Sequence, residues 1–488
     1  MATVAPPARF VLRASALELA AAIRAGELTA REVVDEHIAL VERANERVNA
    51  LVATRFEEAR ADADAADACV KAAEDPAALP PFLGVPCTIK ESFALAGMPN
   101  SSGSLARRDF RPERSATAVA RLVEAGAIPL GVTNTSELTL WIESANRVYG
   151  RTNNAYDPAR TAGGSSGGEG AAIGSGFAPI GLGTDFGGSI RLPAFFNGVF
   201  GHKPSGCLVP HTGHHPYPNE RGSELLGVGP LARHACDLMP FLRAIAGPDG
   251  EDSSVQGCEL GDPAGVSLEG LRVAISDDAS LLPVSLELRN ARVRAARALA
   301  AQGAEVVRVS LPGVKTVLQP YLEAVRNSGG LRELLTEAGD ELPRFAQLAI
   351  DAARRRSDYT TPILISLFVE NLSVHLPAAL ERRAERARER LAEEVNDAIG
   401  EGVLLHPPFA RVAPRHGRTI GRPWMLAPMA LFNLLALPVT QVPLGLNEKG
   451  LPIGVQVAAG RGRDHLPIAV ALELERCFGG WVPPPGTA

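Results

Sequence analysis

The sequence predicts an α/β fold with a mixed or mainly parallel β-sheet, built as one compact unit. Short apolar runs typical of strands alternate along the chain with longer amphipathic stretches typical of helices. Hydrophobic residues make up 46% of the 488 residues and charged residues 21%, which indicates a folded, soluble chain. We find no internal repeat and no low-complexity linker, so one unit is favoured over several domains.

The chain begins with helices. Ser15-Ala-Leu-Glu18 and Thr29-Ala-Arg-Glu32 both match the capping box, in which a hydroxyl and a glutamate satisfy free backbone N–H groups. Each box precedes an apolar-periodic run, which predicts helices over about 15–25 and 30–47. The Ala-rich residues 54–75 predict a third helix.

A buried strand that ends in a lysine follows these helices. The apolar run Leu83-Gly-Val-Pro-Cys-Thr-Ile-Lys90 predicts this strand. Helices and strands then alternate, as expected for an α/β sheet. We expect helices over 117–126 and 169–176, and strands over 127–132 and 178–183.

The second half contains strands on both sides of a long helical region. We expect strands over 271–276, 304–309, 438–444 and 453–458, and a helix over 285–302. Residues 315–400 are charge-rich and predict an inserted, mainly helical region. The apolar run Trp424 to Leu437 is broken by a proline and an asparagine and fits a buried core segment.

Charge and composition exclude several classes of protein. The net charge is −6 and the sequence pI is about 6.0, so we expect no nucleic-acid partner. The N-terminus lacks the apolar core of a secretory signal, and no run of about 18 apolar residues predicts a membrane helix.

The cysteines and histidines show no ligand spacing. The six cysteines form no CxxC pair, which indicates reduced thiols in a cytoplasmic protein. The ten histidines show no HExxH spacing, so we expect no metal site. We interpret His211, His214 and His215 as part of a solvent-exposed loop.

The most informative stretch contains two serine-bearing glycine turns, residues 163–168 and 187–189. A nucleophilic serine needs a proton acceptor and backbone N–H groups that stabilise the oxyanion. Ser189 ends the turn Asp185-Phe-Gly-Gly-Ser, which can direct the N–H groups of residues 186–189 at one point. Ser165 and Ser166 lie in the other turn, which can be tight and strained.

Lys90 is the candidate base. At the end of an apolar run it is desolvated, and desolvation lowers a lysine pKa, so the neutral amine can accept a proton. No Ser-His-Asp triad and no Gly-x-Ser-x-Gly elbow is evident, and a serine–lysine arrangement is a known alternative. The glycine pattern has the wrong order for a nucleotide-binding loop, because no GxGxxG follows an early strand.

Taken together, these motifs resemble the amidase signature family. The resemblance covers most of the chain outside 315–400, and the segment 432–481 is similar to type 2 fatty-acid amide hydrolases and their bacterial relatives. It implies one large domain over 1–488, with a mixed central β-sheet covered by α-helices on both faces. The motifs that carry it are the Lys90 segment, residues 133–137, 150–154, 163–168, 183–193 and 438–443.

The resemblance also implies the roles of the site residues. Ser189 would be the nucleophile, Ser165 a cis-serine bridge and Lys90 the base, with Ser166 hydrogen-bonded to the lysine. The oxyanion hole would comprise the N–H groups of Phe186, Gly187, Gly188 and Ser189, and Asp185 and Arg191 would support the loop. No cofactor or metal is needed, and a small-molecule amide would be cleaved through an acyl-enzyme.

Three functions remain open at this point: a stand-alone amide hydrolase, the glutamine amidase subunit of a tRNA-dependent amidotransferase, and a non-catalytic binding protein. We favour the hydrolase, with an apolar acyl group or an aryl amide as substrate and esters, anilides or carbamates as further substrates. We expect residues 315–400 and the loop at Trp141-Ile142-Glu143 to line the channel that receives the acyl group. The candidate lining residues, for which core packing is an equal alternative, are Leu364, Leu367, Phe368 and Met425. The resemblance suggests a homodimer. The membrane-anchoring N-terminal helix of the animal members is not found in the sequence, so we expect no membrane anchor.

Overall fold

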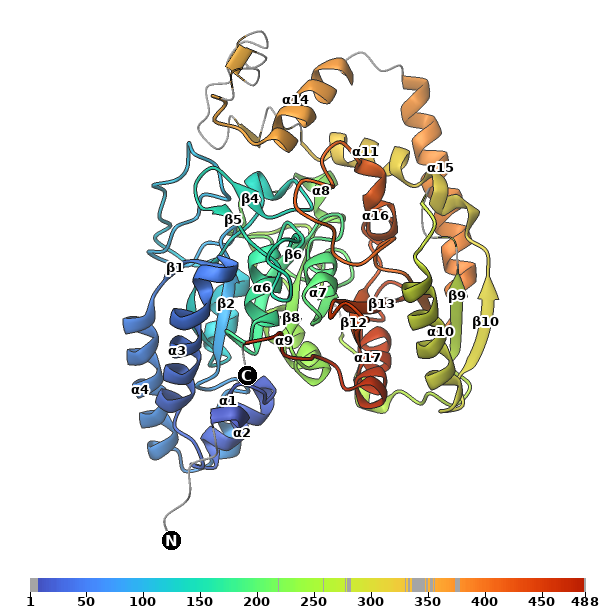
Figure 1. Ribbon diagram of the computed structural model, residues 1–488. Helices are drawn as coiled ribbons and strands as arrows, with labels where there is room; N and C mark the ends of the chain where they lie inside the picture. The colour runs from blue at the N-terminus through green and yellow to red at the C-terminus, as the bar shows by residue number, and fades with distance from the viewer. Residues whose placement is uncertain are drawn as a thin grey trace.

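A mixed β-sheet runs through the computed structural model (Figure 1). The structure describes residues 8–486 except 218, 258, 277, 279–281, 330, 332–333, 336–346, 348–349, 352–353, 355 and 374–377. Within these residues the sheet has 11 strands, in the order β1-β3-β2-β6-β8-β7-β12-β13-β11-β9-β10. The strands are β1 (Leu51–Thr54), β2 (Pro86–Lys90), β3 (Ile128–Thr133), β6 (Ile180–Asp185), β7 (Phe200–Lys203), β8 (Gly227–Ala232), β9 (Arg272–Ser276), β10 (Glu305–Val309), β11 (Val403–His406), β12 (Val439–Leu446) and β13 (Pro452–Ala459).

Parallel and antiparallel pairs both occur, which confirms the predicted mixed sheet. Strand β2 pairs in parallel with β3 and β6, and β9 pairs in parallel with β10 and β11. Between these groups, β8, β7, β12 and β13 make antiparallel pairs. A separate two-stranded ribbon consists of β4 (Ala145–Asn146) and β5 (Gly150–Arg151).

Helices cover both faces of the sheet. The helices are α1 (Ala8–Val11), α2 (Ala16–Arg24), α3 (Ala30–Val48), α4 (Phe56–Ala72), α5 (Thr117–Glu124), α6 (Gly167–Gly174), α7 (Arg191–Phe196), α8 (Glu220–Ser223), α9 (Leu238–Ile245), α10 (Leu286–Ala300), α11 (Leu318–Asn327), α14 (Thr361–Ser373), α15 (Ala378–Ile399), α16 (Ala427–Leu434) and α17 (His465–Phe478). Side chains of a strand alternate between faces. Val273 of β9 packs in the same core cluster as Leu288 of α10, whereas its neighbour Ala274 packs with Leu391 of α15. Each face therefore has its own helical cover.

The predicted elements are present, with boundaries shifted by a few residues. Both capping boxes form: the side chains of Ser15 and Thr29 each accept the backbone N–H of a glutamate three residues on, and that glutamate bonds back. The apolar run that ends at Leu437 contains α16, whose residues are all buried.

Four strands of the 11-stranded sheet were not predicted: β1, β7, β8 and β11. Strand β7 has the sequence Phe-Gly-His-Lys, in which both His202 and Lys203 are fully buried. An apolar pattern cannot reveal a strand whose polar side chains are buried by partners distant in sequence. The strands β1 and β11 have only four residues each, which is too short for a clear period.

The predicted helical region 315–400 is described only in part. Its described parts form α11, α14 and α15, and α14 lies at the outer end of the molecule in Figure 1. Leu364 and Leu367 of α14 pack with Leu138 in a small apolar cluster. The region is thus joined to the chain just before Trp141. The remainder of this prediction falls on residues outside the described part of the chain.

The capping box of α3 can be tested by substitution. Thr29→Ala removes the hydroxyl that accepts the Glu32 N–H at 3.1 Å. We expect the free energy of unfolding to fall by about 1 kcal/mol, because the Glu32 N–H has no partner within the helix and loses its only side-chain acceptor. Thr29→Ser keeps the hydroxyl and is the matched control. Urea denaturation measures both, and an alanine variant as stable as the serine variant would contradict the prediction.

Candidate active site

Lys90 lies at the carboxyl end of β2 and is fully buried. Its Nζ is 2.8 Å from Ser165 Oγ and 2.7 Å from Thr184 Oγ1. Burial lowers the pKa of Lys90 to about 7, although the charges of Asp185 and Glu169 oppose the shift. A lysine without a carboxylate in direct contact therefore carries a large neutral fraction near pH 7.

The Ser165 turn precedes α6 and is tightly packed. The Gly164–Ser165 peptide bond is cis. Ser144 Oγ donates to the Ser165 carbonyl at 2.8 Å and accepts the Gly167 N–H at 2.8 Å, which pins both sides of the turn. A Cβ on Gly164 would come within 2.6 Å of the Trp141 carbonyl oxygen, so the turn requires glycine there.

Ser189 lies in the loop between β6 and α7, with 8% of its surface exposed. Its carbonyl accepts the Ser166 N–H at 3.2 Å, so the two serine turns are in direct contact. The hydroxyls of Ser165 and Ser189, both in the described chain, make no hydrogen bond with each other.

The loop after β6 differs from the prediction at one position. The Gly188 N–H donates to Asp185 Oδ1 at 2.7 Å, so it is directed at the carboxylate and is not free to stabilise an oxyanion. Among the described residues, the N–H groups of Phe186, Gly187 and Ser189 find no acceptor. Three of the four predicted donors are therefore available.

Asp185 and Arg191 form a fully buried ion pair. Arg191 donates to both carboxylate oxygens at 3.0 Å, and Asn433 Nδ2 donates to Asp185 Oδ1 at 2.9 Å. The guanidinium also donates to Gln456 Oε1 at 2.8 Å. Burial alone would raise the pKa of Asp185, but the contact with Arg191 holds this pKa well below its usual range. The carboxylate thus stays charged and anchors the loop.

The predicted contact between Ser166 and Lys90 is absent from this structure, in which both residues are described. Ser166 Oγ donates instead to the Thr184 carbonyl at 3.1 Å. The second partner of the lysine is the Thr184 hydroxyl, which was not predicted. Strands β2 and β6 are parallel neighbours, so Lys90 and Thr184 lie side by side at the carboxyl ends of these strands. Only the pairing of the two strands brings them together.

A buried carboxyl that was also not predicted lies beside this group. Glu169 of α6 is fully buried and accepts hydrogen bonds from Thr88 Oγ1 at 2.6 Å and Thr133 Oγ1 at 2.7 Å. Burial raises the pKa of Glu169 to about 7, against the effect of both hydroxyls and of Lys90. It packs α6 against β2 and β3, the strands that lead into the site.

The expectation of an exposed histidine loop was wrong. His211 and His214 are buried: His211 Nε2 bonds the Leu226 carbonyl at 3.0 Å, and the ring of His214 packs edge-on against Phe93. Backbone and ring contacts hold them in the interior. Across the part of the chain that the structure describes, no three His, Cys, Asp or Glu side chains form a metal-binding group.

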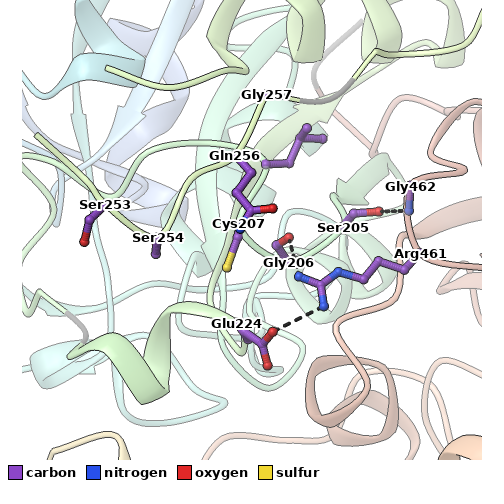
Figure 2. A pocket seen from close by; sticks show the side chains of 11 residues that line it. Ser205, Gly206, Cys207, Glu224, Ser253, Ser254, Gln256, Gly257, Arg461 and Gly462 are labelled. Atoms are coloured by element: carbon purple, nitrogen blue, oxygen red, sulfur yellow. Dashed lines mark hydrogen bonds and ion pairs between the residues drawn. The ribbon is translucent and has the colours of Figure 1, made fainter. Parts of the chain in front are cut away.

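A pocket of about 560 Å³ lies elsewhere, between the residues that follow β7 and the Arg461 turn (Figure 2). Its Arg461 pairs with Glu224 at 3.2 Å, and its Ser205 hydroxyl donates to Asp464 at 2.6 Å. Burial raises the pKa of Cys207, so the thiol there stays protonated.

Three of the four residues predicted to line an acyl channel make packing contacts. Leu364 and Leu367 belong to the Leu138 cluster, and Met425 packs against the main core. Phe368 is half-buried. Trp141 Nε1 donates to Thr419 Oγ1 at 3.0 Å, and the Glu143 carboxylate accepts the Gly417 N–H at 2.9 Å. These contacts tie the Trp141 loop to residues 417–419.

A buried lysine therefore contacts one of two adjoining serine turns at the carboxyl end of β2. A protein-family model described as Amidase matches residues 32–467. The chain belongs to the amidase signature family, and it is a hydrolase of amide bonds.

Individual relatives agree with this assignment. Human "Fatty-acid amide hydrolase 2" is 39% identical over 506 residues, which cover 99% of this chain and 92% of that protein. The glutamyl-tRNA(Gln) amidotransferase subunit from Synechococcus sp. (strain WH7803) is 31% identical, over 92% of this chain and 94% of that protein. The solved structure of 6-aminohexanoate cyclic dimer hydrolase, complexed with substrate, has a TM-score of 0.82 at 25% identity, over 98% of this chain and 99% of that one.

The described helices include no candidate for a membrane span. None of them combines the length and the apolar character needed to cross a bilayer.

Loss of the Arg191 guanidinium should be severe. Arg191→Met leaves the buried Asp185 carboxylate without its cation, so we expect a loss of about 3–5 kcal/mol in the free energy of unfolding. Arg461→Met, which breaks the half-exposed pair with Glu224, is the control and should cost about 1 kcal/mol or less. Urea denaturation compares the two, and equal losses would contradict the assigned role of Arg191.

Proposed function

We propose that this amidase cleaves its substrate through an acyl-enzyme formed on Ser189, with Ser165 and Lys90 as the proton relay. The observation that carries the proposal is the contact of a fully buried lysine with a serine hydroxyl, Lys90 Nζ to Ser165 Oγ at 2.8 Å. A neutral amine in this position can accept a proton from Ser165.

The relay operates in two stages. Lys90 takes the Ser165 proton while Ser165 takes that of Ser189, whose oxygen attacks the amide carbonyl. The tetrahedral oxyanion accepts hydrogen bonds from the free N–H groups of Phe186, Gly187 and Ser189. The proton returns through Ser165 to the departing amine, because an amide anion is too basic to leave. Water then attacks the acyl-enzyme by the same relay and releases the acid and Ser189.

The proposed substrate is an amide with an apolar acyl group or an aryl amine. The 39% identity to human fatty-acid amide hydrolase 2 exceeds the 31% identity to the amidotransferase protein, at similar coverage. This difference favours a stand-alone hydrolase over glutamine hydrolysis within a complex. Esters, anilides and carbamates carry carbonyls that the same serine can attack, and they are proposed as further substrates.

The nucleophile is tested with a panel of a p-nitroanilide, an aryl acylamide, a long-chain fatty amide, a carbamate and glutamine. We expect an apolar amide to be turned over and Ser189→Ala to reduce its kcat by about 10⁴-fold or more, because no other group replaces the attacking oxygen. Ser267→Ala, on an exposed loop, is the control and should be unchanged. Turnover that survives in Ser189→Ala would overturn the mechanism, and turnover of glutamine alone would favour the amidotransferase alternative.

The base is tested by the pH dependence of kcat/KM. Only neutral Lys90 accepts a proton, so the rate should rise with pH through about 7, the value to which burial lowers its pKa. Lys90→Met should abolish the activity, whereas the exposed Lys449→Met should not alter it.

A second buried lysine must be excluded as the source of the pH dependence. Burial also lowers the pKa of Lys203 to about 7, and its Nζ donates to the Pro204 carbonyl at 2.7 Å. The rise should therefore persist in Lys203→Met. A profile that is flat from about pH 6 to 10 would contradict the assignment of Lys90 as the base.

A further inference from the structure

We infer that Tyr321 is a positioning residue, whose hydroxyl orients the Phe186–Gly187 peptide so that the Gly187 N–H can stabilise the oxyanion. The inference rests on the proposed function, in which this loop supplies the oxyanion hole. Tyr321 belongs to α11, more than a hundred residues further along the chain than the loop. Its hydroxyl donates to the Phe186 carbonyl oxygen at 3.2 Å.

The hydroxyl is a permanent donor. Tyr321 is buried, with 5% of its surface exposed. Burial, reinforced by the nearby Asp185 carboxylate, raises the pKa of Tyr321, so the phenol keeps its proton throughout the working pH range. Loss of the hydroxyl would leave the Phe186 carbonyl without this partner in a largely dry environment.

The planarity of the peptide transmits this contact to the reaction. In a trans peptide the C=O and the N–H of the next residue lie in one plane and point in opposite directions. A donor that holds the Phe186 carbonyl on one side therefore directs the Gly187 N–H to the other. The Gly187 N–H has no acceptor among the described residues, as required of an oxyanion donor.

Asp185 does not determine this peptide plane by itself. Its carboxylate accepts the N–H groups of Gly188 and Ile190, which fixes the loop after Gly187. The Phe186–Gly187 unit precedes those contacts, and the Tyr321 hydroxyl is the partner that the structure gives to its carbonyl. The two contacts thus orient successive parts of the same loop.

Close packing explains why residue 187 is glycine. A Cβ built on Gly187 would overlap the hydroxyl oxygen of Tyr321, and the next nearest atom is the ring Cζ at 3.1 Å. The φ angle of Gly187 is not in the left-handed region, so alanine is excluded there by the tyrosine and not by the backbone. Without the hydroxyl, the nearest ring atom would lie 3.1 Å from this Cβ, a contact that a small shift of the side chain can relieve.

The first test is Tyr321→Phe. We expect kcat for the best amide of the panel to fall about tenfold with KM nearly unchanged, a smaller effect than direct removal of an oxyanion donor. The affinity for a trifluoromethyl ketone, which forms a tetrahedral adduct with the serine, should fall by the same factor as kcat/KM. A merely structural defect would lower the amount of folded enzyme without this match.

Tyr156→Phe is the matched control. Tyr156 is similarly buried, and its hydroxyl donates to the Val482 carbonyl, far along the chain from the oxyanion loop. It should keep wild-type kcat and ketone affinity. Equal kcat values for Tyr321→Phe and Tyr156→Phe would overturn the inference.

The second test uses the overlap at Gly187. Gly187→Ala should reduce kcat strongly, because the added Cβ displaces the Tyr321 hydroxyl. Tyr321→Phe introduced into that variant should then lower kcat by much less than the tenfold that it costs alone. A further tenfold loss in the double variant would overturn the inference. If Ser189→Ala is inactive while both Tyr321 tests fail, only the positioning role falls; if Ser189→Ala stays active, the proposed function itself falls.

Discussion

The buried pair of Asp185 and Arg191 is the interaction on which the candidate site depends. It joins the end of β6 to the start of α7, so it holds together the two ends of the intervening loop, which contains Ser189. The same guanidinium reaches Gln456 of β13 and the Met429 carbonyl of α16. Buried ion pairs are costly unless every group is satisfied, and here the contacts with Asn433 and Gln456 supply the missing partners.

Two buried charged groups at this sheet edge behave in opposite ways because of their partners. Asp185 has a guanidinium and several N–H donors and remains charged, whereas Lys90 has only hydroxyls in contact and has its pKa lowered to about 7. The same burial therefore leaves a charged anchor in one case and a lysine with a lowered pKa in the other. The low pKa of Lys90 reflects burial without a carboxylate in direct contact.

The helical region 315–400 contributes to the site as well as covering it. Through α11 it places Tyr321 on the loop that contains Ser189, and α16 brings Met429 against Gly188 on the same loop. Gly187 and Gly188 are thus packed by elements far from them in the chain.

From local signals alone the sequence predicted the fold class and most long elements, and it supplied the three residues of the proposed relay as candidates. Capping boxes, apolar periods and glycine turns are local signals, and Lys90, Ser165 and Ser189 lie within them. It also indicated that Asp185 and Arg191 support the loop, since both lie in one short motif.

Tertiary structure decided the rest, because those contacts join residues far apart in the chain. Thr184, not Ser166, became the second partner of Lys90 once β6 lay beside β2. The Gly188 N–H donates to the Asp185 carboxylate, and the Tyr321 hydroxyl reaches Phe186 from α11. The strand β7 formed around buried polar residues that no apolar pattern reveals. Pairing of strands and satisfaction of buried polar groups are properties of the packed molecule, so they could not be predicted from local sequence.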